Sequence, residues 1–111
     1  MIIIYDDFQK VELRSGTVIK AEEFPAARKP AYKVWVDFGL EIGIKQTSAQ
    51  ITINYKLEEL IGLQVLGVLN LGTKNIAGFE SQFLLLGFSD SKEAIILATT
   101  NKIVPNGKKL H

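Results

Sequence analysis

The densest group of hydrogen-bonding side chains lies in residues 42–51, whose sequence is IGIKQTSAQI. After Ile42 and Ile44 the run becomes polar, and no proline interrupts it. A solvated loop usually carries more Gly, Pro, Asn or Asp, and a core strand carries more Val, Leu and Phe. The run therefore predicts a strand with a polar face. That face fits either a surface that binds a ligand through hydrogen bonds or an edge strand that faces water.

Basic and polar residues near this run could bind RNA, because a strand surface can attract phosphates and hydrogen bond to sugars and base edges. The basic residues are equally compatible with a solvated surface, and Ser48 and Gln50 with a role in satisfying backbone groups at a barrel rim. Asn70 interrupts an apolar run, so its amide either anchors the next loop or faces a ligand. The candidate RNA-binding residues are Arg28, Lys29, Lys33, Lys45, Ser48, Gln50, Asn70, Lys74 and Ser81.

Two aromatic residues are candidates for binding a peptide. Trp35 is the only tryptophan, and on the outside of a sheet it could line an apolar pocket or stack on a base. Packing in the core or at a subunit interface is the alternative for Trp35. Phe79 follows a glycine in an expected loop, where it could contact an apolar side chain or simply anchor the loop.

The composition argues against an enzyme and against a metal or cofactor site. The chain has no cysteine, and its one histidine is the last residue, His111. Thiolate ligands, cysteine nucleophiles and histidine triads are therefore excluded. Asp6–Asp7 and Glu22–Glu23 are adjacent carboxylates, but no nucleophile has a base partner and no glycine-rich phosphate loop is present. We expect no catalytic residues.

Size and charge predict one compact domain over residues 1–111. The net charge is only +1, so recognition of a polyanion would depend on local clustering of basic residues. The apolar start at Ile2–Ile4 is too short for a signal segment, and no apolar run approaches membrane-spanning length. We therefore expect a cytoplasmic protein without membrane insertion.

The hydrophobic pattern predicts an all-β fold. Val34, Val36 and Phe38 alternate with Lys33, Trp35 and Asp37. We expect strands in residues 12–23 (bent at Gly16), 32–39, 42–51, 64–71, 81–88 and 94–99, loops at 24–30 and 72–80, and short helices from Asp6 or Asp7 to Val11 and within 52–61. Five principal strands with a helix between the third and fourth predict a five-stranded OB-fold barrel, with short N- and C-terminal extensions.

Several segments in order resemble the CsaA family of bacterial export-related chaperones. The most specific are GIKQTSAQIT at 43–52 and VPNG at 104–107, and the others are DF at 7–8, LRSGT at 13–17, FPAARKPA at 24–31, DFG at 37–39, ELIG at 59–62 and IAGF at 76–79 with Ser81. That family is similar to a wider tRNA-binding group, which includes the C-terminal domain of many methionyl-tRNA synthetases and the endothelial-monocyte-activating polypeptide. Asn75–Ile76–Ala77 has fewer cations than that wider group, which predicts fewer phosphate contacts.

The resemblance implies a homodimer that acts as a chaperone in protein export. Its implied partners are unfolded or preprotein peptide segments, tRNA, and with them the export machinery. Residues 1–11 and 94–111 would form the dimer, and the apolar Ile2–Ile4 independently suggests a docking segment. The alternative is a tRNA-binding module without a chaperone role.

Overall fold

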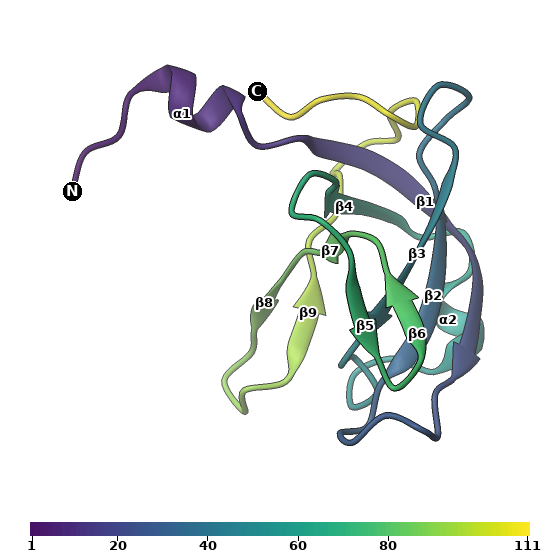
Figure 1. Cartoon of the computed structure of the whole chain (residues 1–111). Coiled ribbons are helices and arrows are strands. Elements are labelled where there is room, and N and C mark those ends of the chain that lie inside the picture. Colours follow the sequence, from purple (N-terminus) through teal and green to yellow (C-terminus); the bar gives the residue numbers. More distant parts are fainter.

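The computed structural model describes all residues 1–111 and contains two short helices and nine strands (Figure 1). Five strands form one sheet in the order β3-β2-β1-β4-β7, and β5–β6 and β8–β9 form two separate hairpins. The bounds are α1 Tyr5–Gln9, β1 Leu13–Glu23, β2 Tyr32–Asp37, β3 Ile44–Ala49, α2 Leu57–Leu60, β4 Gln64–Val68, β5 Lys74–Ile76, β6 Phe79–Ser81, β7 Leu84–Leu85, β8 Gly87–Ser89 and β9 Ile95–Leu97.

The long strand β1 holds the barrel together because its two halves pair with different neighbours. Its first half pairs antiparallel with β4, and its second half pairs with β2. The register shifts between Val18 and Lys20, so the bulge lies at Ile19 and not at Gly16, which pairs in regular register with Val65 of β4. Gly16 serves close packing instead, since a Cβ atom there would lie 2.5 Å from Cγ1 of Val36.

The sheet curls into a nearly closed antiparallel barrel, which confirms the predicted OB-fold architecture. β7 pairs with β4, and the hydroxyl of Thr47 on β3 donates to the carbonyl of Phe83 at 2.7 Å across the closing seam. Helix α2 lies between β3 and β4, as predicted, and buries Leu60 completely. The inward residues of β2 form the centre of the core, where the rings of Phe38 and Phe83 pack edge to face at 5.0 Å.

Three local predictions differ from the structure. Helix α1 begins after Ile4, and Asp7 accepts a hydrogen bond from the Ile4 amide within its first turn, so neither aspartate is the N-cap. Residues 72–80, expected as a loop, contain the β5–β6 hairpin. The expected strand 81–88 is divided, because after Leu86 the chain leaves the barrel to pair with β9.

The C-terminal segment folds back onto its own barrel. Ser15 on β1 accepts from the Lys108 amide at 3.0 Å and donates to the Pro105 carbonyl at 2.8 Å. Buried Gln64 donates to the Val104 carbonyl at 2.6 Å and accepts from the Val104 amide at 3.0 Å. This segment therefore fills the edge of β1 that β2 leaves unpaired. No helix combines the length and apolar character needed to cross a bilayer.

The β5–β6 turn carries avoidable strain, which leads to a stability prediction. Its two central residues, Ala77 and Gly78, have φ angles of +49° and +84°, a combination typical of a type I′ turn. Asparagine tolerates the first position better than alanine. We expect Ala77→Asn to raise the free energy of unfolding by about 0.5 kcal/mol, measured by urea denaturation. Ala26→Asn, in an exposed loop, is the control, and equal effects of the two changes would contradict this explanation.

Candidate nucleic-acid interface

The outer face of β2 and β3 brings two predicted residues directly together. The register pairs Lys33 with Ser48 and Trp35 with Gln46, all on the side that points away from the core. The alternation of β2 explains this placement, because its buried residues Val34 and Val36 occupy the opposite side. The predicted alternation of this strand is therefore confirmed, and of the alternatives for Trp35 the structure rules out packing in the core of the barrel.

An aromatic cluster of Phe24, Trp35 and Phe79 lies on this face. The Phe79 ring contacts the other two in edge-to-face geometry, at 5.5 Å from Phe24 and 5.9 Å from Trp35 between ring centroids. Phe24 is buried, whereas Trp35 and Phe79 remain partly exposed. Phe24 comes from the loop after β1 and Phe79 from the β5–β6 hairpin, so three separate segments assemble the aromatic cluster.

Two ammonium groups lie over these rings. Nζ of Lys33 is 5.0 Å from the centroid of Phe24 and 5.1 Å from that of Phe79. Nζ of Lys20 is 4.5 Å from the Trp35 centroid and also pairs with Glu22 at 3.3 Å. Both ammoniums lie within the range of a cation–π attraction. Positive charge is therefore concentrated on the exposed side of the aromatic cluster.

Gln46 positions the aromatic cluster. Its Oε1 accepts from the Trp35 indole N–H at 3.2 Å, and its Nε2 donates to the Glu80 carbonyl at 2.9 Å. Its backbone N–H donates to Oε1 of Gln82 at 3.0 Å. These bonds attach the β5–β6 hairpin to β3 and fix the indole orientation. These bonds use one of the two lone pairs and one of the two N–H donors of the Gln46 side chain.

Several side chains at this end of the barrel have no hydrogen-bond or ion-pair partner within the chain. The Ser48 hydroxyl is one, next to Lys33 across the β2–β3 pair, and Gln50 is exposed just beyond β3. Arg28 and Lys29 are exposed on the β1–β2 loop, at the lower end of the barrel in Figure 1. Lys74 is exposed on β5, opposite Ser81 in the hairpin. These groups are available to an external ligand.

The structure does not bring the other three predicted RNA-binding residues to this face. Lys45 pairs with Val36 and so lies on the opposite side of β3 from Ser48. Asn70 lies at the far end of β4, where its amide accepts from the Glu12 N–H at 2.9 Å and donates to the Lys10 carbonyl at 2.7 Å. These contacts show that Asn70 has an anchoring role and that it anchors the N-terminal segment.

Ser81 is 8% exposed, and its hydroxyl is already engaged. Its Oγ lies 2.9 Å from Oγ1 of Thr47 and accepts from the Ser48 amide at 3.2 Å. The Ser81 side chain therefore joins β6 to β3 beneath the outer face. Its contacts place it as a support for Ser48 and not as part of the exposed surface.

Two adjoining hollows of 620 and 350 Å³ are lined by residues of the β1–β2 loop and share Pro30 and Thr52. Arg28 lines the first hollow and Lys29 with Gln50 the second. Tyr32 forms part of the first, where burial, together with Glu23, Glu58 and Glu59, raises the pKa of its phenol. Tyr32 therefore stays protonated and donates to the Tyr55 carbonyl at 2.8 Å, which ties β2 to the segment after β3.

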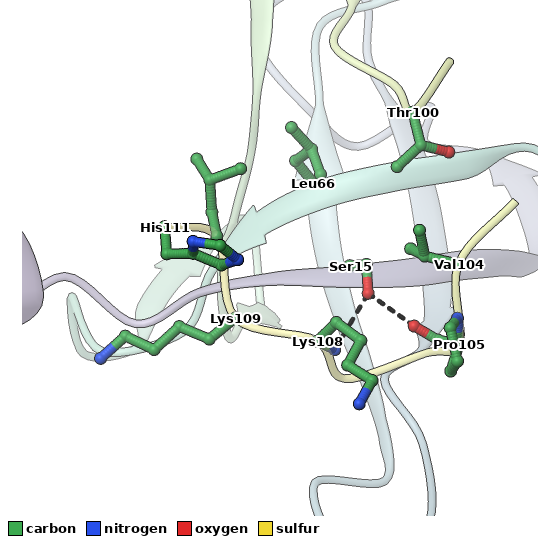
Figure 2. A pocket seen from close by; sticks show the side chains of 9 residues that line it. Ser15, Leu66, Thr100, Val104, Pro105, Lys108, Lys109 and His111 are labelled. Atoms are coloured by element: carbon green, nitrogen blue, oxygen red, sulfur yellow. Dashed lines mark hydrogen bonds between the residues drawn. The ribbon is translucent and has the colours of Figure 1, made fainter. Parts of the chain in front are cut away.

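A third hollow of 460 Å³ lies against the C-terminal segment, away from the aromatic cluster. Figure 2 shows Ser15 in it, hydrogen bonded to Pro105 and Lys108. Lys109 lines it too, but its ammonium donates to the Gln9 carbonyl at 2.8 Å and lies 3.7 Å from Glu12. No group of three or more His, Asp or Glu side chains converges anywhere to hold a metal ion.

Sequence reasoning missed two members of the interface, Phe24 and Lys20. Phe24 precedes Pro25 in a loop, and its contact with Phe79 spans more than fifty residues, so no local pattern indicates it. Lys20 follows the register shift in β1, which breaks simple alternation. Side chains alternate along a strand, so Lys20 lies on the same side of β1 as Glu22. This alternation could have identified Lys20, since the register pairs Glu22 with Lys33 and Lys20 with Trp35.

Comparison with known proteins shows the family to which this chain belongs. Residues 13–109 match the tRNA-binding domain family, tRNA_bind. The chain belongs to this family. It is 36% identical over 106 residues to a methionine–tRNA ligase of Thermotoga maritima, a match that covers 96% of the chain and 16% of the ligase. A ligase of Methanococcus aeolicus is 37% identical over 109 residues, with 98% and 16% covered. The chain thus spans about a sixth of the length of these curated relatives.

Solved structures match the whole length of this tRNA-binding domain protein. The chaperone CsaA of Bacillus anthracis is 44% identical with a TM-score of 0.92, and the match covers 100% of both chains. CsaA of Picrophilus torridus is 41% identical with a TM-score of 0.91, covering 99% of this chain and 100% of that one. A protein related to methionyl-tRNA synthetase from Pyrococcus horikoshii is 29% identical with a TM-score of 0.87, covering 100% and 99%. The predicted family resemblance is confirmed.

Proposed function

We propose that this protein is a non-catalytic module that binds tRNA through the outer face of β2 and β3 and the adjacent β1–β2 loop. The observation that carries the proposal is the pairing of Lys33 with Ser48, together with the unpartnered side chains of Arg28 and Lys29 on the adjacent loop and of Gln50 just beyond β3. Phosphates attract such cations, while the hydroxyl and amide can hydrogen bond to sugar or base edges. Membership of the tRNA-binding domain family supports RNA as the ligand.

Local clustering explains how a chain of net charge +1 could bind a polyanion. The ammonium of Lys33 and the side chains of Arg28 and Lys29 are not neutralised by any ion pair within the chain. In contrast, Lys10, Arg14, Lys20 and Lys109 all pair with carboxylates. Arg28, Lys29 and Lys33 therefore supply uncompensated positive charge at the end of the barrel where the polar groups are free, whereas other unpaired cations, such as Lys102 and Lys108, lie in the C-terminal segment.

A matched pair of double variants tests this site. We expect Arg28→Gln with Lys29→Gln to weaken tRNA binding and to reduce the slope of log K against log salt by roughly 1.4–1.8, since two phosphate contacts are lost. Lys102→Gln with Lys108→Gln removes the same charge from exposed positions of the C-terminal segment and is the control. Filter binding or fluorescence anisotropy at several salt concentrations measures both. Equal losses in the two variants would mean that total charge, not this site, determines binding.

We also propose a homodimer built from the terminal segments. In Figure 1, α1 and the β8–β9 hairpin stand away from the barrel on the same side. Exposed apolar side chains lie on both, with Tyr5 of α1 at 66% and Phe88 of β8 at 73%, and Ile2 just before α1 is exposed at 98%. Apolar groups exposed to this extent usually find a partner surface. The CsaA chaperones of known structure cover the same full length of chain, which is consistent with a shared assembly.

A second candidate function is a chaperone role in protein export, in which unfolded or preprotein segments bind to exposed apolar surface. The specific observations in its favour are the likeness to two CsaA chaperones and the partly exposed rings of Trp35 and Phe79. In either role we propose that the protein acts in the cytoplasm, where tRNA and newly made preproteins are found. Salt separates the two activities, because RNA binding should weaken steeply with ionic strength and apolar peptide binding should not.

A further inference from the structure

We propose that the aromatic cluster receives an unpaired nucleobase of the RNA, which stacks on Trp35 or Phe79 while Lys33 and Lys20 move off the rings to hold its phosphates. This inference rests on the proposed RNA-binding function and assigns the class of RNA element that the face recognises. A base inside a duplex has both faces covered by its neighbours, so only an unpaired base can stack on a protein ring. The ligand is therefore a single-stranded loop, bulge or end.

The geometry of the rings supports stacking. Phe79 contacts both Phe24 and Trp35 through edge-to-face packing, at interplanar angles of 66° and 77°. In this arrangement the rings hold one another in place without stacking face to face. The faces are instead covered by the two ammonium groups, at 4.5 Å for Lys20 over Trp35 and 5.1 Å for Lys33 over Phe79. The stacking surfaces are thus preformed, and the ammonium groups of two lysines lie over them.

The lysines can exchange one partner for another. The Lys20 side chain is 57% exposed, so its ammonium can swing outward without disturbing the core. A nucleotide offers both groups that this exchange needs, because its base takes over the ring face and its phosphate takes over the ammonium. An apolar peptide side chain would displace the ammonium and give it no anion in return. The arrangement of charge over rings therefore favours a nucleotide over an apolar side chain.

Hydrogen-bonding groups lie where the rest of a stacked nucleotide would be. The free hydroxyl of Ser48 is directly across from Lys33, and its backbone is held by Ser81. The indole of Trp35 is held by Gln46, so its orientation is set before any ligand arrives. Stacking of this kind tolerates different bases, because every base has a π face. We therefore expect a preference for unpaired structure over any particular sequence.

Trp35 is the only tryptophan, so its fluorescence reports on this site alone. We expect an unstructured pyrimidine RNA of about ten nucleotides, within the span of an OB fold, to bind and quench this fluorescence. The same strand annealed to its complement should leave the fluorescence unchanged. Phe79→Leu should weaken binding of the single strand about tenfold, whereas Phe79→Tyr, which keeps the ring, should retain it.

Leu40→Ala is the control, because Leu40 is fully exposed in the β2–β3 turn, outside both the aromatic cluster and the terminal segments. Thermal unfolding of each variant checks that the barrel is intact. Lys33→Gln provides a second test, and it should lower the affinity for the single strand while the quenching of Trp35 fluorescence remains.

Binding of tRNA without quenching by the single strand, or equal quenching by the duplex, would overturn the stacking site but leave the RNA-binding function. Loss of both tRNA and single-strand binding in the unmodified protein would overturn both. Quenching by an apolar peptide alone would identify a polypeptide as the occupant.

Discussion

Gly107→Ala is expected to lower the free energy of unfolding by about 3 kcal/mol, and urea denaturation should show a clear fall in the midpoint. Gly107 has a φ angle of +86°, where a side chain is strained. A Cβ atom there would also lie 2.5 Å from the backbone carbonyl oxygen of Phe38. Phe38 is fully buried at the centre of the barrel, so its backbone cannot move aside without disturbing the core.

Gly72→Ala separates the two causes. Gly72 has nearly the same φ angle, +84°, but a Cβ atom there would have no neighbour within 4 Å. We expect Gly72→Ala to cost only about 1 kcal/mol, which is the backbone strain alone. The difference between the two variants then measures the contact of the VPNG segment with the barrel. If both variants lost the same free energy of unfolding, the cost at Gly107 would come from its φ angle alone and not from the contact with Phe38.

The strand pattern of β2 could be predicted because one side of it is apolar and the other is not. Val34 and Val36 identify the buried side, and this fixes the outward position of Lys33 and Trp35. The succession of strands along the chain and the position of α2 were predicted from the same kind of evidence, because the spacing of apolar residues changes from alternation to helical spacing and back. For this reason the OB-fold barrel and the centre of the candidate interface were both accessible from sequence.

The faces of β3 could not be assigned in this way, because residues 45–48 are polar on both sides. Thr47 is buried among the core residues, where its hydroxyl contacts Ser81 and the Phe83 carbonyl. A polar residue whose hydrogen bonds are supplied by distant segments gives no local signal of burial. Lys45 was consequently grouped with Ser48, although the register puts them on opposite sides.

The β5–β6 hairpin was missed for a related reason. Its strands contain three residues each, and Asn75, Ser81 and the turn residue Gly78 are residue types that are typical of loops. The hairpin exists because Phe79 packs on Trp35 and Phe24, and because Gln46 and Ser48 bond to its second strand and to Gln82 just beyond it. These are long-range contacts. The same contacts assemble the aromatic cluster, so the part of the site that sequence could not predict is the part that tertiary packing creates.

Gln64→Leu is expected to lower the free energy of unfolding by about 3 kcal/mol, because several buried hydrogen bonds are lost together. Gln64 is 7% exposed, and its side-chain amide binds the Val104 carbonyl, the Val104 amide and the hydroxyl of Thr100. Leucine has a similar size but leaves these groups without partners. Two of them belong to the backbone of the C-terminal segment, so this segment should detach before the barrel unfolds.

Detachment should also weaken the proposed dimer, since the C-terminal segment is one of its expected components. Hydrogen exchange is expected to show lost protection at residues 104–110 in Gln64→Leu, and sedimentation should show a shift from dimer to monomer. Gln50→Leu is the control, because Gln50 is exposed and has no partner within the chain. If Gln64→Leu lost stability uniformly, with residues 104–110 no more affected than β2, then Gln64 would support the barrel as a whole. A local loss would instead show that one buried amide determines whether the terminal segment is available for assembly.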